Sequence, residues 1–173
     1  QRADEHGALA SVLHARRTDP RIGEWLVNAD AKDEVAVANI REIKRTYERT
    51  AKVPADLATE LAKTTSLAHR VWAEARGSED VASFLPMLEK VVALRREEAA
   101  ALAGNSDPYD ALIEDFEPGT TGAEIATIFD AMRKRLVPLR QAILGKPAPA
   151  KLSQVFDEDG QLALSQKLAV AFG

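Results

Sequence analysis

Apolar side chains recur at helical spacing through most of this chain, and this periodicity restricts the fold more than any other feature. After Ile125 the apolar residues fall three or four positions apart, and most of the basic residues between them lie on the other side of the helix. The stretch from Pro54 to Arg76 repeats the pattern. No alternating run is long enough for a confident strand, and no repeat has a fixed period. The sequence therefore predicts an all-α fold, a bundle or array of about seven to eight helices.

Short local signals place the ends of these helices. Asp19-Pro20 and Asp107-Pro108 each set a side-chain acceptor before a proline that suits a first helical turn. Thr121 and Glu124 form a capping box. The predicted helices cover residues 3–17, 20–29, 33–52, 54–76, 83 or 84 to 103, 108–115, 121–143 and 161–172.

Glycine and proline mark the predicted interruptions. Gly77 is expected to end the helix before it, and Pro86 suits a first turn better than a helix interior. Pro138 should kink its helix. Because residues 145–149 read GKPAP, they are the best linker candidate. We expect a helical scaffold over residues 1–144 and a linker with a terminal helix over 145–173, together forming one structural unit.

Composition excludes several classes of function. The 173 residues are 46% hydrophobic, which suits a single-core domain, and the net charge of −4 disfavours nucleic-acid and anionic-lipid partners. Zero cysteines exclude disulfides, zinc ribbons, iron–sulfur ligation and a thiol nucleophile. The apolar runs are too short to cross a bilayer. We expect a soluble, cytoplasmic protein, although a targeting segment could precede Gln1.

Charge is unevenly distributed along the chain. Residues 97–132 hold nine acidic residues and no Lys or Arg, so the rest of the chain carries +5 against the net charge of −4. Residues 133–151 hold six basic residues and no acidic ones. The two blocks are either solvated helix faces of opposite sign or the walls of a polarised cleft.

The residues that could carry chemistry form no recognisable active site. The three histidines lack chelating spacing, and no H-E-x-x-H, phosphate loop or G-x-S-x-G elbow occurs. Clustered acids could bind a hard cation or could simply suit a helix start. Asp157 to Gly160 is better explained as a turn and N-cap than as part of an EF-hand. The histidines are His6, His14 and His69; the clustered acids are Asp107, Asp110, Glu114, Asp115 and Glu117; Trp25 and Trp72 are expected in the core.

A longer motif points to a known family. Residues 107–119 read DPYDALIEDFEPG, which resembles the D-P-Y-D-A-L-L-D-D-Y-E-P-G stretch of the carboxypeptidase Taq metallopeptidases. The resemblance covers nearly the whole chain, with mild departures at Phe116 and Thr120. Other matching positions are Leu13-His14, Thr18 to Pro20, Ile22-Gly23, Trp72, Ala75-Arg76, Phe84, Pro86, Leu88, Leu94 to Glu97 and Leu136 to Leu139.

This resemblance implies a helical fold around a deep groove, usually in a homodimer, with a divalent metal such as zinc or cobalt. In that family the metal is held by the two His of H-E-x-x-H and a downstream Glu, and it activates water on a peptide carbonyl. Those motifs follow the region that residues 161–173 resemble. The sequence accordingly carries no catalytic, cofactor-binding or metal-binding residue of the family, and it matches the pattern as if truncated at both ends.

The resulting hypothesis is an inactive N-terminal fragment that supplies scaffold and groove wall to a carboxypeptidase. Its expected partners are the missing catalytic half, a second copy of the chain and, in the parent, a peptide substrate; neither nucleic acid nor membrane is expected. Two alternatives stay open. One is a free-standing helical interaction or oligomerisation module, and the other is an acidic cation-binding protein that uses Asp110 and Glu114.

Overall fold

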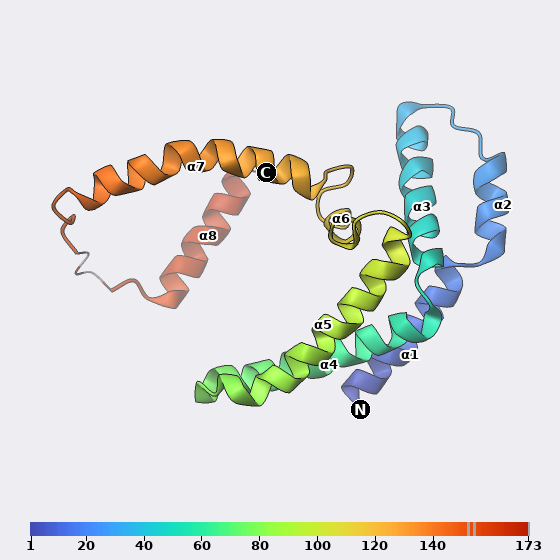
Figure 1. Cartoon of the computed structure of the whole chain (residues 1–173), viewed down its shortest axis with the longest axis horizontal. Coiled ribbons are helices and arrows are strands. Elements are labelled where there is room, and N and C mark those ends of the chain that lie inside the picture. The colour runs from blue at the N-terminus through green and yellow to red at the C-terminus, as the bar shows by residue number, and fades with distance from the viewer. Residues whose placement is uncertain (152, 154, 173) are drawn as a thin grey trace. The chain divides into compact units, whose positions relative to one another are not determined.

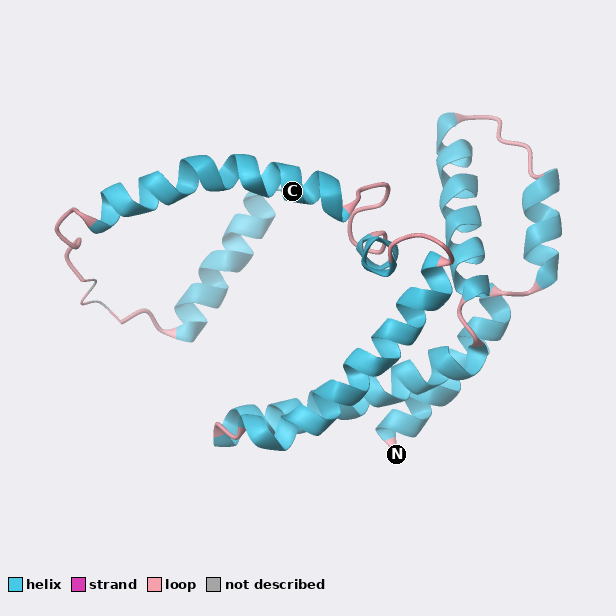
Figure 2. Ribbon diagram, in the orientation of Figure 1, coloured by secondary structure: helices cyan, strands magenta, loops and turns pink. Residues whose placement is uncertain are grey.

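A computed structural model describes residues 1–151, 153 and 155–172 of the chain (Figure 1). Over these residues the secondary structure consists of helices joined by loops, with no strand (Figure 2). The all-α prediction is therefore confirmed. The helices are α1 (Arg2–Arg17), α2 (Pro20–Asn28), α3 (Glu34–Lys52), α4 (Ala55–Ser78), α5 (Val81–Ala103), α6 (Pro108–Ile113), α7 (Gly122–Leu144) and α8 (Glu158–Phe172).

The predicted capping signals start the helices that follow them. Asp19 accepts a hydrogen bond from the Arg21 amide at 3.0 Å, and Asp107 accepts one from the Tyr109 amide at 2.7 Å. Each bond satisfies a donor that the first helical turn leaves unpaired. The two Asp-Pro starts are confirmed.

The capping box at the start of α7 is also confirmed. The Glu124 carboxylate accepts hydrogen bonds from the Thr121 amide at 2.8 Å and from its hydroxyl at 2.9 Å, and that hydroxyl lies 3.3 Å from the Glu124 amide. These two bonds, the backbone one first, lower the pKa of Glu124. The carboxylate at this helix start is therefore held in its charged form.

The predicted end of α4 is wrong. The helix continues through Gly77 to Ser78, and Glu79 ends it in the left-handed conformation with φ 55°. The Ser78 hydroxyl donates to the Glu74 carbonyl at 3.0 Å, which satisfies one acceptor of the last turn. The stop therefore comes from a non-glycine residue two positions beyond Gly77.

The start of α5 also lies earlier than predicted. Asp80 accepts from the Ser83 amide at 3.2 Å, and the Ser83 hydroxyl donates back to the Asp80 carbonyl at 2.9 Å. This N-cap begins the helix at Val81, so Pro86 lies inside it. Pro138 likewise lies inside α7, which is continuous across it.

The chain divides into two compact units, Gln1–Ala126 and Thr127–Gly173. In the first unit α1 packs on α4, α4 on α5 and α5 on α6, while α2 and α3 pack together and α3 also meets α1 and α5. The domain division expected from the sequence, at residue 144, stays a prediction.

The core of the first unit is built largely from small side chains. This composition lets the helices approach closely, and it leaves little room for bulky rings. Thr64, at 1% exposed, is the most deeply buried residue that the structure describes in this core. The other buried residues are Ala3, Gly7, Leu61, Ala68, Ala75, Ala99 and Leu102.

The expectation that both tryptophans lie in the core is wrong. Trp25 is 63% exposed and Trp72 is 48% exposed. Trp25 lies on the short helix α2, where the Arg21 guanidinium sits 5.8 Å from the ring centroid. Trp72 lies beside His69, three residues earlier on the same helix, with ring centroids 5.9 Å apart.

The second unit comprises most of α7, the loop after it and α8. The predicted linker at residues 145–149 contains no helix, which confirms the break there. No helix in the described part of the chain combines the length and apolar character that a membrane crossing needs. Large apolar side chains on both helices are at least 47% exposed: Ile128, Phe129, Met132, Leu136, Leu139, Ile143, Leu162, Leu164, Leu168, Val170 and Phe172.

Candidate functional site

The acidic motif at residues 107–119 forms a tightly bonded turn around α6. Asp110 accepts a hydrogen bond from the Gly122 amide at 2.7 Å, and Glu114 accepts one from the Gly119 amide at 2.8 Å. Gly119 has φ +80°, a conformation that a side chain disfavours. The carboxylates of the motif thus bind the backbone of their own loop, which is a structural use of both candidate cation ligands.

Two arginines of α3 fix this turn to the body of the first unit. Arg49 donates to the Ala111 carbonyl at 3.0 Å and to the Asp115 carboxylate at 2.7 Å. Arg45 donates to the Glu114 carbonyl at 2.9 Å. Because these bonds join groups more than 60 positions apart in the sequence, they hold the motif against α3.

Arg45 is only partly satisfied by this arrangement. Its Nε lies 3.3 Å from the Glu114 Oε1 as an ion pair, yet it is buried and forms no hydrogen bond within the described residues. The ion pair supplies Coulomb attraction without hydrogen-bond geometry. Arg45 therefore acts as a clamp on the backbone of the turn more than as a partner of the Glu114 side chain.

Two residues of the acidic block pair with basic residues from another part of the chain, and the two alternatives for the blocks, solvated helix faces or the walls of a cleft, stay predictions. Glu114 and Asp115 are paired with arginines of α3, which lie outside the basic block at residues 133–151. Sequence reasoning missed Arg45 and Arg49 because the pairing joins distant segments, and helical spacing alone gives no signal for it.

The three histidines have separate surroundings. His14 Nε2 lies 2.7 Å from the Val53 carbonyl and ties α1 to the connection between α3 and α4. His6 and His69 are exposed and line a groove described below. Within the described residues no three potential ligands of the His, Cys, Asp or Glu type come together as a metal-binding group.

Asp157 is the N-cap of a helix, as predicted, but no turn follows it: α8 begins at Glu158, earlier than the predicted start at residue 161. Asp157 accepts a hydrogen bond from the Gly160 amide at 2.6 Å, immediately at the beginning of α8. This is N-cap geometry, in which a short carboxylate satisfies a free amide of the first turn.

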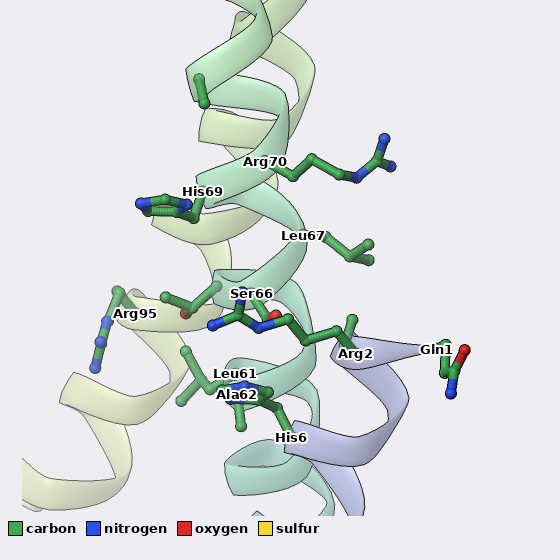
Figure 3. A pocket seen from close by; sticks show the side chains of 13 residues that line it. Gln1, Arg2, His6, Leu61, Ala62, Ser66, Leu67, His69, Arg70 and Arg95 are labelled. Carbon is green, nitrogen blue, oxygen red and sulfur yellow. The ribbon is translucent and has the colours of Figure 1, made fainter.

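A hollow lies between α1, α4 and α5 (Figure 3). Its volume is about 1020 Å³. Its lining combines apolar residues near the core with cationic and imidazole groups at the rim. The residues are Gln1, Arg2, Ala3, His6, Leu61, Ala62, Thr65, Ser66, Leu67, His69, Arg70, Ala73 and Arg95. Sequence reasoning did not single out this groove, because its basic residues come from three helices.

Comparison with known proteins gives a match along the entire chain. Residues 1–173 match the family described as carboxypeptidase Taq (M32) metallopeptidase. The chain is 37% identical to thermostable carboxypeptidase 1 of Thermus thermophilus, a match that covers 99% of the chain and 37% of that relative. It is 33% identical to thermostable carboxypeptidase 1 of Pyrococcus furiosus, over 83% of the chain and 30% of that relative.

Solved structures agree with this match. The structure described as BsuCP has a TM-score of 0.85 at 26% identity, and the match covers 99% of this chain and 36% of that one. Trypanosoma cruzi metallocarboxypeptidase 1 has a TM-score of 0.67 at 32% identity, over 89% of this chain and 33% of that one. The chain thus spans about a third of the length of the relatives that it matches. On the whole-chain match, the protein belongs to the carboxypeptidase Taq (M32) family of metallopeptidases.

Proposed function

We propose that this chain is the N-terminal helical part of a metal-dependent carboxypeptidase that removes C-terminal amino acids from peptides. The observation that carries the proposal is the family match over residues 1–173, in a sequence that contains no H-E-x-x-H. In this proposal the segment supplies scaffold and groove wall and is inactive by itself. The parent would be a cytoplasmic homo-oligomer.

The described residues do not fit the metal that the family implies. Since they bring no three potential ligands together, we place the ligands of the zinc or cobalt ion in the catalytic part of the parent and derive no step through the metal here. The role left for this chain is to position helices, and the arginine clamp on residues 107–119 supports that role.

The proposal is tested by the coding sequence that follows the codon for Gly173. We expect an H-E-x-x-H on a predicted helix within roughly the next hundred residues, with a glutamate ligand downstream, because zinc peptidases of this kind bind the metal through that helical spacing. A downstream sequence that encodes another motif set, or a stop codon directly after Gly173, would contradict it.

The exposed apolar residues of α7 and α8 favour a second candidate, a free-standing interaction module. Many exposed apolar side chains on neighbouring elements of the sequence favour a contact with another protein segment. Analytical ultracentrifugation and thermal unfolding distinguish the candidates. A compact monodisperse monomer with a high, cooperative melting transition supports the module, whereas oligomers or poor solubility support a part cut from a larger fold.

A further inference from the structure

The groove between α1, α4 and α5 has a lining of one charge sign. Its 13 described lining residues include three arginines and two histidines, and none is Asp or Glu. The chain as a whole is acidic, with a net charge of −4. The groove is therefore a local positive surface on an acidic protein, which favours a bound anion.

Cationic residues line the groove from both sides of α4. Figure 3 shows Arg2 and His6 extending from α1 on one side and Arg95 coming from α5 on the other. The side chain of Arg2 runs across α4 toward Ser66, while Arg70 points away from Arg95. A ligand in the groove could thus meet guanidinium groups on two walls at once.

Part of this positive charge has no partner in the fold. Arg2 and His6 make no ion pair or side-chain hydrogen bond with any residue that the structure describes, and of the two neighbouring acids on α1, Asp4 is paired with Lys63 at 2.7 Å. Arg70 is paired with Glu74 and Arg95 with Glu98, and both of these acids lie outside the lining. Arg2 is thus the guanidinium most available to a ligand.

The rest of the lining suits the body of a small molecule. Leu61 and Ala3 are each 7% exposed and form an apolar base, and the hydroxyls of Thr65 and Ser66 add hydrogen-bond donors. The volume of about 1020 Å³ lies near the upper end for small-molecule sites, which typically measure about 300–1,000 Å³. A single phosphate ion would leave most of it empty.

We propose that this groove binds a small polyanion, one that presents at least two oxyanion groups, carboxylate or phosphate, to Arg2 and Arg95 across α4. Guanidinium forks match both kinds of oxyanion because their donors pair with two oxygens. The proposal goes beyond the carboxypeptidase assignment, and its failure would leave that assignment intact.

The test is a titration of the 173-residue chain followed by the ring signals of His6 and His69 in NMR spectra. Inorganic pyrophosphate serves as the phosphate probe and triglutamate as the carboxylate probe, with sodium chloride keeping the ionic strength constant. We expect the NMR signals of these rings to shift in a saturable way with at least one probe. The probe that binds more tightly shows whether the ligand presents phosphate or carboxylate groups. Shifts that do not saturate, or that chloride alone reproduces, would overturn the proposal.

Three substitutions distinguish specific binding in the groove from nonspecific electrostatic attraction of the anion to the protein. Arg2→Gln and Arg95→Gln should each weaken binding about threefold, as expected for exposed ion pairs. Arg76→Gln is the matched control, because Arg76 is an exposed arginine of α4 that does not line the groove. Far-UV circular dichroism of each variant verifies that the helices are retained. Equal weakening by Arg76→Gln would overturn the proposal.

Discussion

Single side chains of this protein form hydrogen bonds between segments that are distant in the sequence. His14 holds the Val53 carbonyl, and Arg49 holds both the Ala111 carbonyl and Asp115. Each of these residues satisfies backbone or carboxylate acceptors that their segments cannot satisfy locally. At this scale, most of the polar side chains that could be ligands stabilise the fold instead.

Asp19 gives a residue-scale prediction for pH. Hydrogen bonds from the Arg21 guanidinium, followed by the Arg21 amide, lower the pKa of Asp19 from 3.8 to about 2. Because the folded pKa is the lower one, the stabilising contribution is present above pH 3.8 and is lost as pH falls through about 2. In Arg21→Gln we expect the pKa to rise toward 3.8 yet remain below it, since the amide still donates.

Carbon-detected NMR of the aspartate carboxyl groups measures this pKa directly. Arg17→Gln is the control, because Arg17 is another exposed arginine close to Asp19 in the sequence and is not a cause of the shift. An unchanged Asp19 pKa in Arg21→Gln would show that the guanidinium does not hold the carboxylate.

At the scale of elements, the helices that begin with a side-chain cap were the most predictable. Asp19, Asp107 and the Thr121–Glu124 box act on amides within three residues, so the sequence contains the whole interaction. Gly77 and Pro86 predicted the wrong helix ends, because Glu79 and Asp80 set the end of α4 and the start of α5. Glu79 and Asp80 are weaker indications of a helix end or start in a sequence than glycine and proline are.

A pair of substitutions at the end of α4 checks this explanation. A Cβ added at Gly77 meets nothing within 4 Å, so Gly77→Ala should raise the free energy of unfolding by up to about 1 kcal/mol through helix propensity. Glu79→Gly should also raise it, because Glu79 holds φ 55°. Urea denaturation measures both changes. Destabilisation by Gly77→Ala would mean that α4 ends at Gly77 after all.

At the scale of the whole molecule, the fold class was predictable and the packing of side chains was not. Helical periodicity is repeated in every long segment, whereas burial of Trp25 or Trp72 depends on how closely other helices approach. The groove of Arg2, His6 and Arg95 is also a product of tertiary structure, since its residues are spread over α1, α4 and α5. A single sequence does not indicate which helices meet.

Two features of the chain are unusual for a domain that folds and functions alone. The chain spans about a third of its relatives, and the apolar faces of α7 and α8 stay open in the described residues. Both features suit a segment completed by further chain in the parent. They support the proposed role of the chain as the structural part of a carboxypeptidase.

The most direct test of that claim is a peptidase assay of the 173-residue chain with a blocked dipeptide substrate and added zinc or cobalt. Because the chain lacks H-E-x-x-H and no described residues gather as a metal-binding group, we predict no turnover above the metal-only control. Turnover that depends on the added metal and survives repurification of the chain would contradict the account.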